Sequence, residues 1–153
     1  MNTDKKPWDS KRYLEKSGGY EFLFSGRKIH KLRFGGGGVK LALWDDFFTT
    51  ISFGMEFDFV QQNQSQRLAA VNVVSLSPLL QLVDCEIESA VADEKGFLHL
   101  RFNNGIQIQA PSDAGEFRFE AWEITDGHGF LVVCAIGGTV TIWDPYVPKL
   151  FNF

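Results

Sequence analysis

The chain has 153 residues, which fits one domain of ordinary size, and its 44% hydrophobic residues are enough for a packed core. A charged fraction of 22% excludes an intrinsically disordered chain. The net charge of −4 is uneven, because residues 1–40 carry +6 (ten Lys/Arg, four Asp/Glu) and residues 41–153 carry −10 (five Lys/Arg, fifteen Asp/Glu). This asymmetry fits either an ordinary solvated surface or a charged interaction surface.

Targeting and redox signals are weak throughout the chain. No apolar stretch follows the first lysines, and no run approaches the roughly 18 apolar residues of a membrane span. Cys85 and Cys134 are too few and too far apart for a disulfide framework or a zinc site. We therefore expect a cytoplasmic protein with two free, buried thiols, and a single disulfide is the alternative.

The N-terminal segment is polar, unlike the rest of the chain. Residues 1–19 predict a flexible N-terminal arm, with two helical turns between Asp9 and Lys16 as an option. A single β domain is expected over 20–153, because aromatic residues suited to strands are abundant. It begins with a strand over 20–24 and a basic strand around Ile29, and four glycines at 35–38 predict a loop.

The clearest signal is a hairpin near residues 39–53. Val39, Leu41 and Leu43 alternate with other residues, and an acidic turn at 44–46 precedes the return strand. Alternation over 51–59 predicts that the return strand is long and has one solvated face. Residues 61–75 are interpreted as a connection, part of it possible helix, and Ser77-Pro78 as the start of a short helix.

The second half of the sequence resembles the first. A shift of 59 residues places 39–43 on 98–102 and the turn at 45–46 on Asn104-Gly105. The sequence thus predicts pseudo-repeats at about 20–60 and 79–124, followed by a C-terminal hairpin over 130–143. The expected fold class is all-β: an antiparallel sandwich or partly open barrel with a duplicated strand-hairpin unit and one short helix.

No catalytic or metal-binding constellation stands out. The pair Asp45/Asp46 falls in a turn, and the pair Glu56/Asp58 falls on a solvated strand face, so structural roles explain both. The three histidines are scattered and are not spaced as metal ligands. We expect a protein that is not an enzyme and that uses neither a cofactor nor a metal.

The basic run from Arg27 to Arg33 has the charge to contact phosphates. It lacks the interleaved aromatic side chains of a nucleic-acid module, so a basic edge strand that resists unwanted pairing is the preferred interpretation. Neither nucleic acid nor a membrane is expected as a partner.

Over about residues 20–144 the chain resembles a family of small bacterial proteins known only as a domain of unknown function. The matching segments are Gly26-Arg27-Lys28-Ile29, the hairpin from Val39, residues 82–87, Gly96-Phe97-Leu98 through Asn104-Gly105, Glu120-Ala121-Trp122-Glu123, and Gly137-Gly138 to Trp143. Asp84 stands where the family pattern has glycine, and the Phe-rich segment 53–59 also departs from that pattern. The resemblance implies no activity and no cofactor.

Small acidic bacterial proteins of this class suggest, by analogy alone, an immunity protein that neutralises a cognate toxin. An acidic surface would steer association with a basic toxin domain. The expected contact residues are one aromatic anchor and seven carboxylates: Trp44, Asp45, Asp46, Glu56, Asp58, Glu116, Glu120 and Glu123. The alternative is a small-molecule binder with a Phe-lined cavity for an apolar ligand, and an enzyme that the sequence hides is a third, weaker hypothesis.

Overall fold

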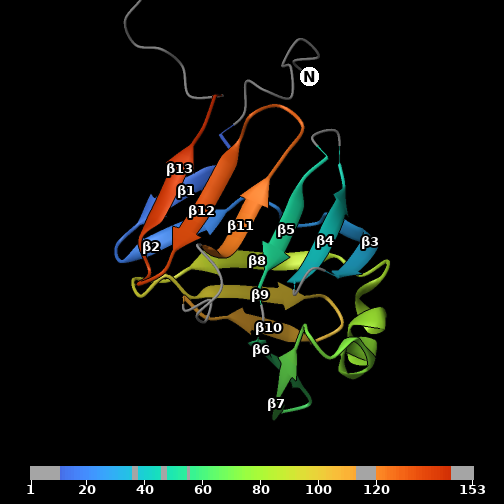
Figure 1. Cartoon of the computed structure of the whole chain (residues 1–153). Helices are drawn as coiled ribbons and strands as arrows, with labels where there is room; N and C mark the ends of the chain where they lie inside the picture. Colours follow the sequence, from blue (N-terminus) through green and yellow to red (C-terminus); the bar gives the residue numbers. More distant parts are fainter. Residues whose placement is uncertain (1–10, 36–37, 46–47, 55, 113–119, 146–153) are drawn as a thin grey trace, which may run out of the picture.

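Two antiparallel sheets are formed by the residues that the computed structural model describes: 11–35, 38–45, 48–54, 56–112 and 120–145 (Figure 1). The seven-stranded sheet has the order β1 (Tyr13–Lys16), β2 (Gly19–Phe22), β8 (Ile87–Ala92), β9 (Leu98–Phe102), β10 (Gln107–Ala110), β6 (Glu56–Gln61), β7 (Gln64–Ala69). The six-stranded sheet has the order β13 (Val140–Trp143), β12 (Leu131–Ala135), β11 (Glu120–Thr125), β5 (Thr50–Phe53), β4 (Gly38–Trp44), β3 (Lys28–Gly35).

The two sheets form a sandwich, which decides between the two architectures that the sequence left open. Their strands cross at a steep angle (Figure 1). Alternate side chains of each strand point into the space between the sheets, and these are the buried aliphatic and aromatic residues. One inward row crosses all of the six-stranded sheet and consists of Val140, Cys134, Trp122, Phe53, Val39 and Phe34.

The duplicated unit is visible in the pairing register. In each copy a strand pairs with a hairpin: β3 with β4–β5, and β8 with β9–β10. Both copies have a β-bulge at the same place, between Ile29 and Lys31 in the first and between Ile87 and Ser89 in the second. A bulge inserts one residue and bends the strand, so its recurrence marks a shared geometry.

The two copies meet at their equivalent residues. Lys28 and Glu86 form an antiparallel bridge, and a shift of 58 residues converts one into the other. The amide of Ile29 donates to the carbonyl of Cys85, and the amide of Ile87 donates to the carbonyl of Arg27. Equivalent residues thus exchange equivalent hydrogen bonds, as an approximate two-fold axis through this bridge requires.

The strand that follows each copy in the chain belongs to the opposite sheet. After β5 the chain crosses to the seven-stranded sheet, where β6 pairs with β10. After β10 it crosses back, and β11 pairs with β5. The two halves are therefore interlocked rather than stacked side by side.

The long strand expected over residues 51–59 is wrong, because this crossing divides it. β5 ends at Phe53 in one sheet and β6 begins at Glu56 in the other. Phe53 and Phe57 both point into the core from opposite sheets, and their ring centroids lie 4.8 Å apart. The alternation survives because both strands face the same core.

Two further connections differ from expectation. Residues 64–69 form β7, an edge strand, where the sequence suggested part of a linker. The turn before it has positive φ at both Gln62 (51°) and Asn63 (63°), the backbone of a two-residue hairpin turn. The short helix is present as a 3₁₀ helix, η2 (Val73–Leu82), which starts before the predicted Ser77-Pro78 and contains Pro78.

The segment suggested as a flexible arm, with a helical option, contains a strand. Residues 13–16 form β1, which pairs with β2, and residues 1–10 lie outside the described ranges. Arg12 precedes β1 and is 1% exposed, with its guanidinium 2.8 Å from both Asp126 Oδ2 and Thr49 Oγ1. The rings of Phe24 and Phe130 also lie within 5.5 Å of this guanidinium, so it fastens the N-terminal strand to the core.

The structure also describes Asp84, the two cysteines and the length of the helices. Asp84, which stands where the family pattern has glycine, has a positive φ of 68°. Both cysteines are free thiols, but only Cys134 is buried, and Cys85, expected to be buried, is half-buried. Burial, followed by the charge of Asp93, raises the pKa of Cys134 to about 11. Among the described residues, no helix is long and apolar enough to cross a membrane.

Candidate functional site

The outer face of the six-stranded sheet is the candidate site. Two outward rows cross it, because residues opposite each other in an antiparallel pair share a face. The first row is Trp143, Leu131, Thr125, Thr50, Ala42 and Lys31. The second row is Thr141, Val133, Glu123, Ser52, Lys40 and Arg33. The face therefore changes from apolar on β12–β13, through hydroxyls in the middle, to cations on β3–β4.

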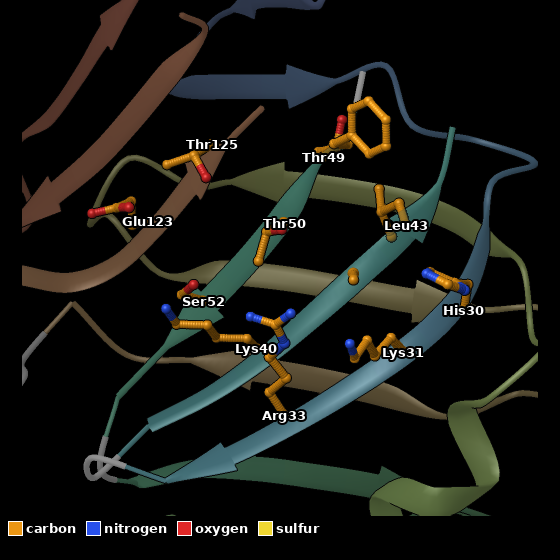
Figure 2. A pocket seen from close by; sticks show the side chains of 12 residues that line it. His30, Lys31, Arg33, Lys40, Leu43, Thr49, Thr50, Ser52, Glu123 and Thr125 are labelled. Atoms are coloured by element: carbon orange, nitrogen blue, oxygen red, sulfur yellow. The ribbon is translucent and has the colours of Figure 1, made fainter. Parts of the chain in front are cut away.

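A hollow of about 330 Å³ lies over the middle of this face. Its floor is low because Ala42, Thr50 and Ser52 are small, and longer side chains on the flanking strands stand above them. Figure 2 shows Lys31 and Arg33 on one side of the hollow and Glu123 and Thr125 on the other, with the Lys40 side chain reaching from β4 toward Ser52. We call Lys31, Arg33 and Lys40 the cationic end of the face.

Aromatic rings border the cationic end. Trp44, the last residue of β4, is 70% exposed, and its ring packs edge-on against that of His30 with centroids 4.9 Å apart. His30 is the extra residue of the β3 bulge, which explains why it reaches this neighbour. Phe48, which lines the hollow, is 75% exposed and has a positive φ of 56°, uncommon for a bulky residue. The basic strand thus has the aromatic neighbours that its own sequence lacks.

Glu123 is the carboxylate nearest the middle of the face. Burial raises its pKa, as do the hydrogen bond with Glu120 and the negative charge of Glu120, while the charge of Lys40 lowers it. The net direction is upward. Lys40 is therefore close enough to influence Glu123, but it does not neutralise the pair of carboxylates.

Asp45 is not an available contact residue. Its side chain is only 6% exposed, accepts a hydrogen bond from Arg27 at 3.0 Å and forms an ion pair with it. Asp45 also accepts a hydrogen bond from the amide of Thr49 at 3.1 Å. It holds the β4–β5 turn closed, which is the structural role that Asp favours in turns. Asp46, its neighbour, lies outside the described residues.

The remaining expected acidic contacts lie on different surfaces. Glu56 is exposed and Asp58 is half-buried on β6 of the seven-stranded sheet, where Asp58 pairs with Arg67 at 3.0 Å. Glu120 and Glu123 lie on β11 of the other sheet, and Glu116 is outside the described residues. The structure does not bring the described carboxylates together as one acidic surface.

Sequence reasoning missed the cationic end as a cluster. Lys40 follows Arg33 by seven residues and a glycine loop, so only the register Arg33↔Lys40 shows that they are neighbours. The signal available in the sequence was the +6 charge of residues 1–40. Among the described residues, no group of three or more His, Cys, Asp or Glu is placed to hold a metal ion.

A family model described as a family of unknown function, DUF6188, matches residues 21–144. The chain belongs to this family. The match begins within β2 and includes all strands from β3 to β13. Comparisons with curated proteins and with solved structures give no match.

Proposed function

We propose that this DUF6188 chain is a non-enzymatic binding protein that holds a protein partner against the outer face of the six-stranded sheet. One observation carries the proposal: this face gathers exposed Trp44 and Trp143, three cations and a floor of small side chains. Trp and Arg dominate the binding energy of many protein interfaces, and a low floor lets a partner's side chains enter. Trp44 and Trp143 are 70% and 52% exposed, and a tryptophan offers a partner a large apolar surface.

The alternative, an apolar ligand in a Phe-lined cavity, finds less support. Among the residues that the structure describes, seven phenylalanines are buried in the core: Phe22, Phe24, Phe53, Phe57, Phe59, Phe102 and Phe130. Phe22 and Phe24 are stacked with centroids 6.1 Å apart, and Phe22 also packs edge-on against Trp122. Core packing therefore explains these buried phenylalanines without a ligand.

A toxin-neutralising role remains a proposal at the level of class. The acidic charge of residues 41–153 is what favoured a basic toxin domain as partner. The candidate face has the opposite charge at its cationic end, so a partner seated there would present acidic groups. We therefore keep the immunity-type role as a hypothesis but move the expected interface from the acidic residues to this face.

The test is to co-express the chain with the product of each adjacent gene, and to ask which product co-purifies and whether its toxicity is relieved. Hydrogen exchange of the purified complex should show protection in β4, β5 and β11. Trp44→Ala and Trp143→Ala should weaken capture, whereas Val91→Ala, on the outer face of the seven-stranded sheet, should not. Protection confined to the seven-stranded sheet, or no product that binds, would contradict the proposal.

A further inference from the structure

The cationic end lacks close ion pairs within the described part of the protein, although Lys40 lies near enough to Glu123 to lower the pKa of that carboxyl. Lys31, Arg33 and Lys40 are exposed, and none of them forms an ion pair with a described residue. By contrast, Arg12, Arg27 and Arg67 each pair with an aspartate. Three neighbouring cations repel one another only weakly in solvent, but together they attract an anion more strongly than any one of them alone.

The second repeat supplies an internal comparison. In it Ser89 pairs with Arg101 as Lys31 pairs with Ala42, and Val91 pairs with His99 as Arg33 pairs with Lys40. The three cations of the first copy therefore correspond to Ser89, Val91 and His99. His99 has its own partner, Asp93, at 2.7 Å. The same fold is built without a cationic cluster at these positions, so the cluster is not a requirement of the architecture.

The surroundings of the cluster fit carboxylates held on an extended chain. The hydroxyls of Thr50 and Ser52 lie beside the cluster in the hollow and can donate hydrogen bonds. Trp44 stands at the edge, where it can cover an apolar side chain or backbone. Glu120 and Glu123 lie on β11, on the side of the hollow opposite Lys31 and Arg33, and their negative charge would repel an anion placed near β12.

We propose that the cationic end binds an acidic polypeptide segment of the partner, with its carboxylates on Lys31, Arg33 and Lys40 and its apolar side chains against Trp44. This inference rests on the proposed function and names the chemistry of the partner. Charge complementarity at such a site would speed association and make binding sensitive to salt.

The test uses the full chain and a fluorescein-labelled peptide of alternating Glu and Ala. Anisotropy should show binding that weakens as salt rises from about 0.05 to 0.3 M. The variant K31A/R33A/K40A should weaken binding by at least about ten-fold, since charged contacts are lost together. The control R101A removes one arginine from the opposite face and should change binding by less than about two-fold.

Two further ligands decide the chemistry. A peptide of alternating Gln and Ala should not bind, and equal binding of this neutral peptide would overturn the inference. A single-stranded oligothymidylate of the same length should bind more weakly than the acidic peptide. Tighter binding of the oligonucleotide would make the face a nucleic-acid site and would overturn the acidic-peptide assignment. Circular dichroism of each variant must match the parent, and R33K should restore part of the binding lost in R33A.

The same variants separate the two proposals. If K31E/R33E/K40E captures the cellular partner as well as the parent while Trp44→Ala does not, the binding function stands and the acidic segment is refuted. If neither variant affects capture, the face itself is wrong.

Discussion

Arg12 carries a prediction about the stability of the fold. Its guanidinium is 1% exposed and its partner Asp126 is fully buried. Arg12→Ala would remove the charge partner of that carboxylate and leave it the amide donors of His128 and Phe130, and breaking a buried ion pair in this way costs about 3–5 kcal/mol. We expect the melting temperature to fall by roughly 6–20 °C, given about 2–4 °C per kcal/mol for a chain of this size. Differential scanning calorimetry measures this shift.

Lys16 is the matched control for Arg12, since it lies four residues along the same N-terminal segment. It forms an ion pair with Glu21 in which its own side chain is 61% exposed. Exposed pairs contribute about 0–1 kcal/mol, so Lys16→Ala should leave the melting temperature nearly unchanged. Equal effects of the two substitutions would show that Arg12 is not held as described.

Glu123 carries a prediction about pH. Its pKa is raised in the folded protein, so its protonated form contributes stability that is present below the ordinary Glu pKa and lost as pH rises through the raised value. At neutral pH the ionised side chain is therefore a net cost. Glu123→Gln should raise stability at pH 7 by less than about 1 kcal/mol, because the site is partly exposed.

The same substitution should give no advantage in acid, where the parent is already protonated at this position. Urea unfolding at pH 7 and again near pH 4 measures the difference. Glu56→Gln, on the other sheet, serves as the control for a general effect of lost negative charge. A gain for Glu123→Gln that is equal at both pH values would contradict the assigned cause.

At the scale of elements, two turns fix the separation of the sheets where they meet. Gly96, in the β8–β9 turn, has φ of 82°, and a Cβ there would lie 2.5 Å from the carbonyl oxygen of Gly138 in the β12–β13 turn. The carbonyl of Gly96 also accepts a hydrogen bond from the Trp122 indole at 2.7 Å. Backbone meets backbone at this point, so no side chain can rotate to make room.

Gly96→Ala should therefore destabilise the protein by about 2–5 kcal/mol, from positive-φ strain together with overpacking. Gly105→Ala is the control, because Gly105 has a similar φ of 87° but open space around its Cβ position. It should cost only the strain, about 1–2 kcal/mol. Chemical denaturation of both variants measures the difference, and equal losses would contradict the close contact between the turns.

The elements also show how far sequence reasoning could go. Hairpins with alternation on both strands, such as β4–β5 and β9–β10, were predictable because each strand has one buried face. β7 was not, because four of its six residues are exposed and polar at the sheet edge, which leaves no alternation to read. The break between β5 and β6 could not be predicted, because the odd-numbered residues of both strands point into the same core and the alternation continues across the break. The cationic end was hidden because it depends on register across strands.

At the scale of the whole molecule, the cations of residues 1–40 fall into two groups, one paired in the fold and one exposed on the outer face. Within residues 1–40, Arg12 and Arg27 pair with aspartates from later in the chain, so part of the +6 stabilises the fold. Lys31, Arg33 and Lys40 remain on the outer face. Composition could show the excess of cations but could not divide it between the interior and the surface.

The interlocked topology predicts that neither half of the chain folds alone. A cut between Val83 and Asp84 would separate β1–β7 and η2 from β8–β13. The strand pairs β2–β8, β10–β6 and β11–β5 would then each lose one partner, and every one of these is an interior pair of its sheet. Exposed interior strand edges and half of the core cannot offset the entropy of ordering either fragment.

Fragments 1–83 and 84–153 should therefore each give collapsed amide dispersion in NMR spectra, and mixing them should restore the dispersed spectrum of the intact chain. The hydrogen bonds between Ile29 and Cys85 and between Ile87 and Arg27 should be recovered in the mixture as slowly exchanging amides. A control pair is cut inside the β6–β7 turn, between Gln62 and Asn63. Here too the strand pairs β2–β8, β10–β6 and β11–β5 join the two fragments, but β7 and η2 belong to the C-terminal fragment. These fragments should also fold only when mixed. If fragment 1–83 or 84–153 folds by itself, the exchange of β6 and β11 is not what holds the sandwich together.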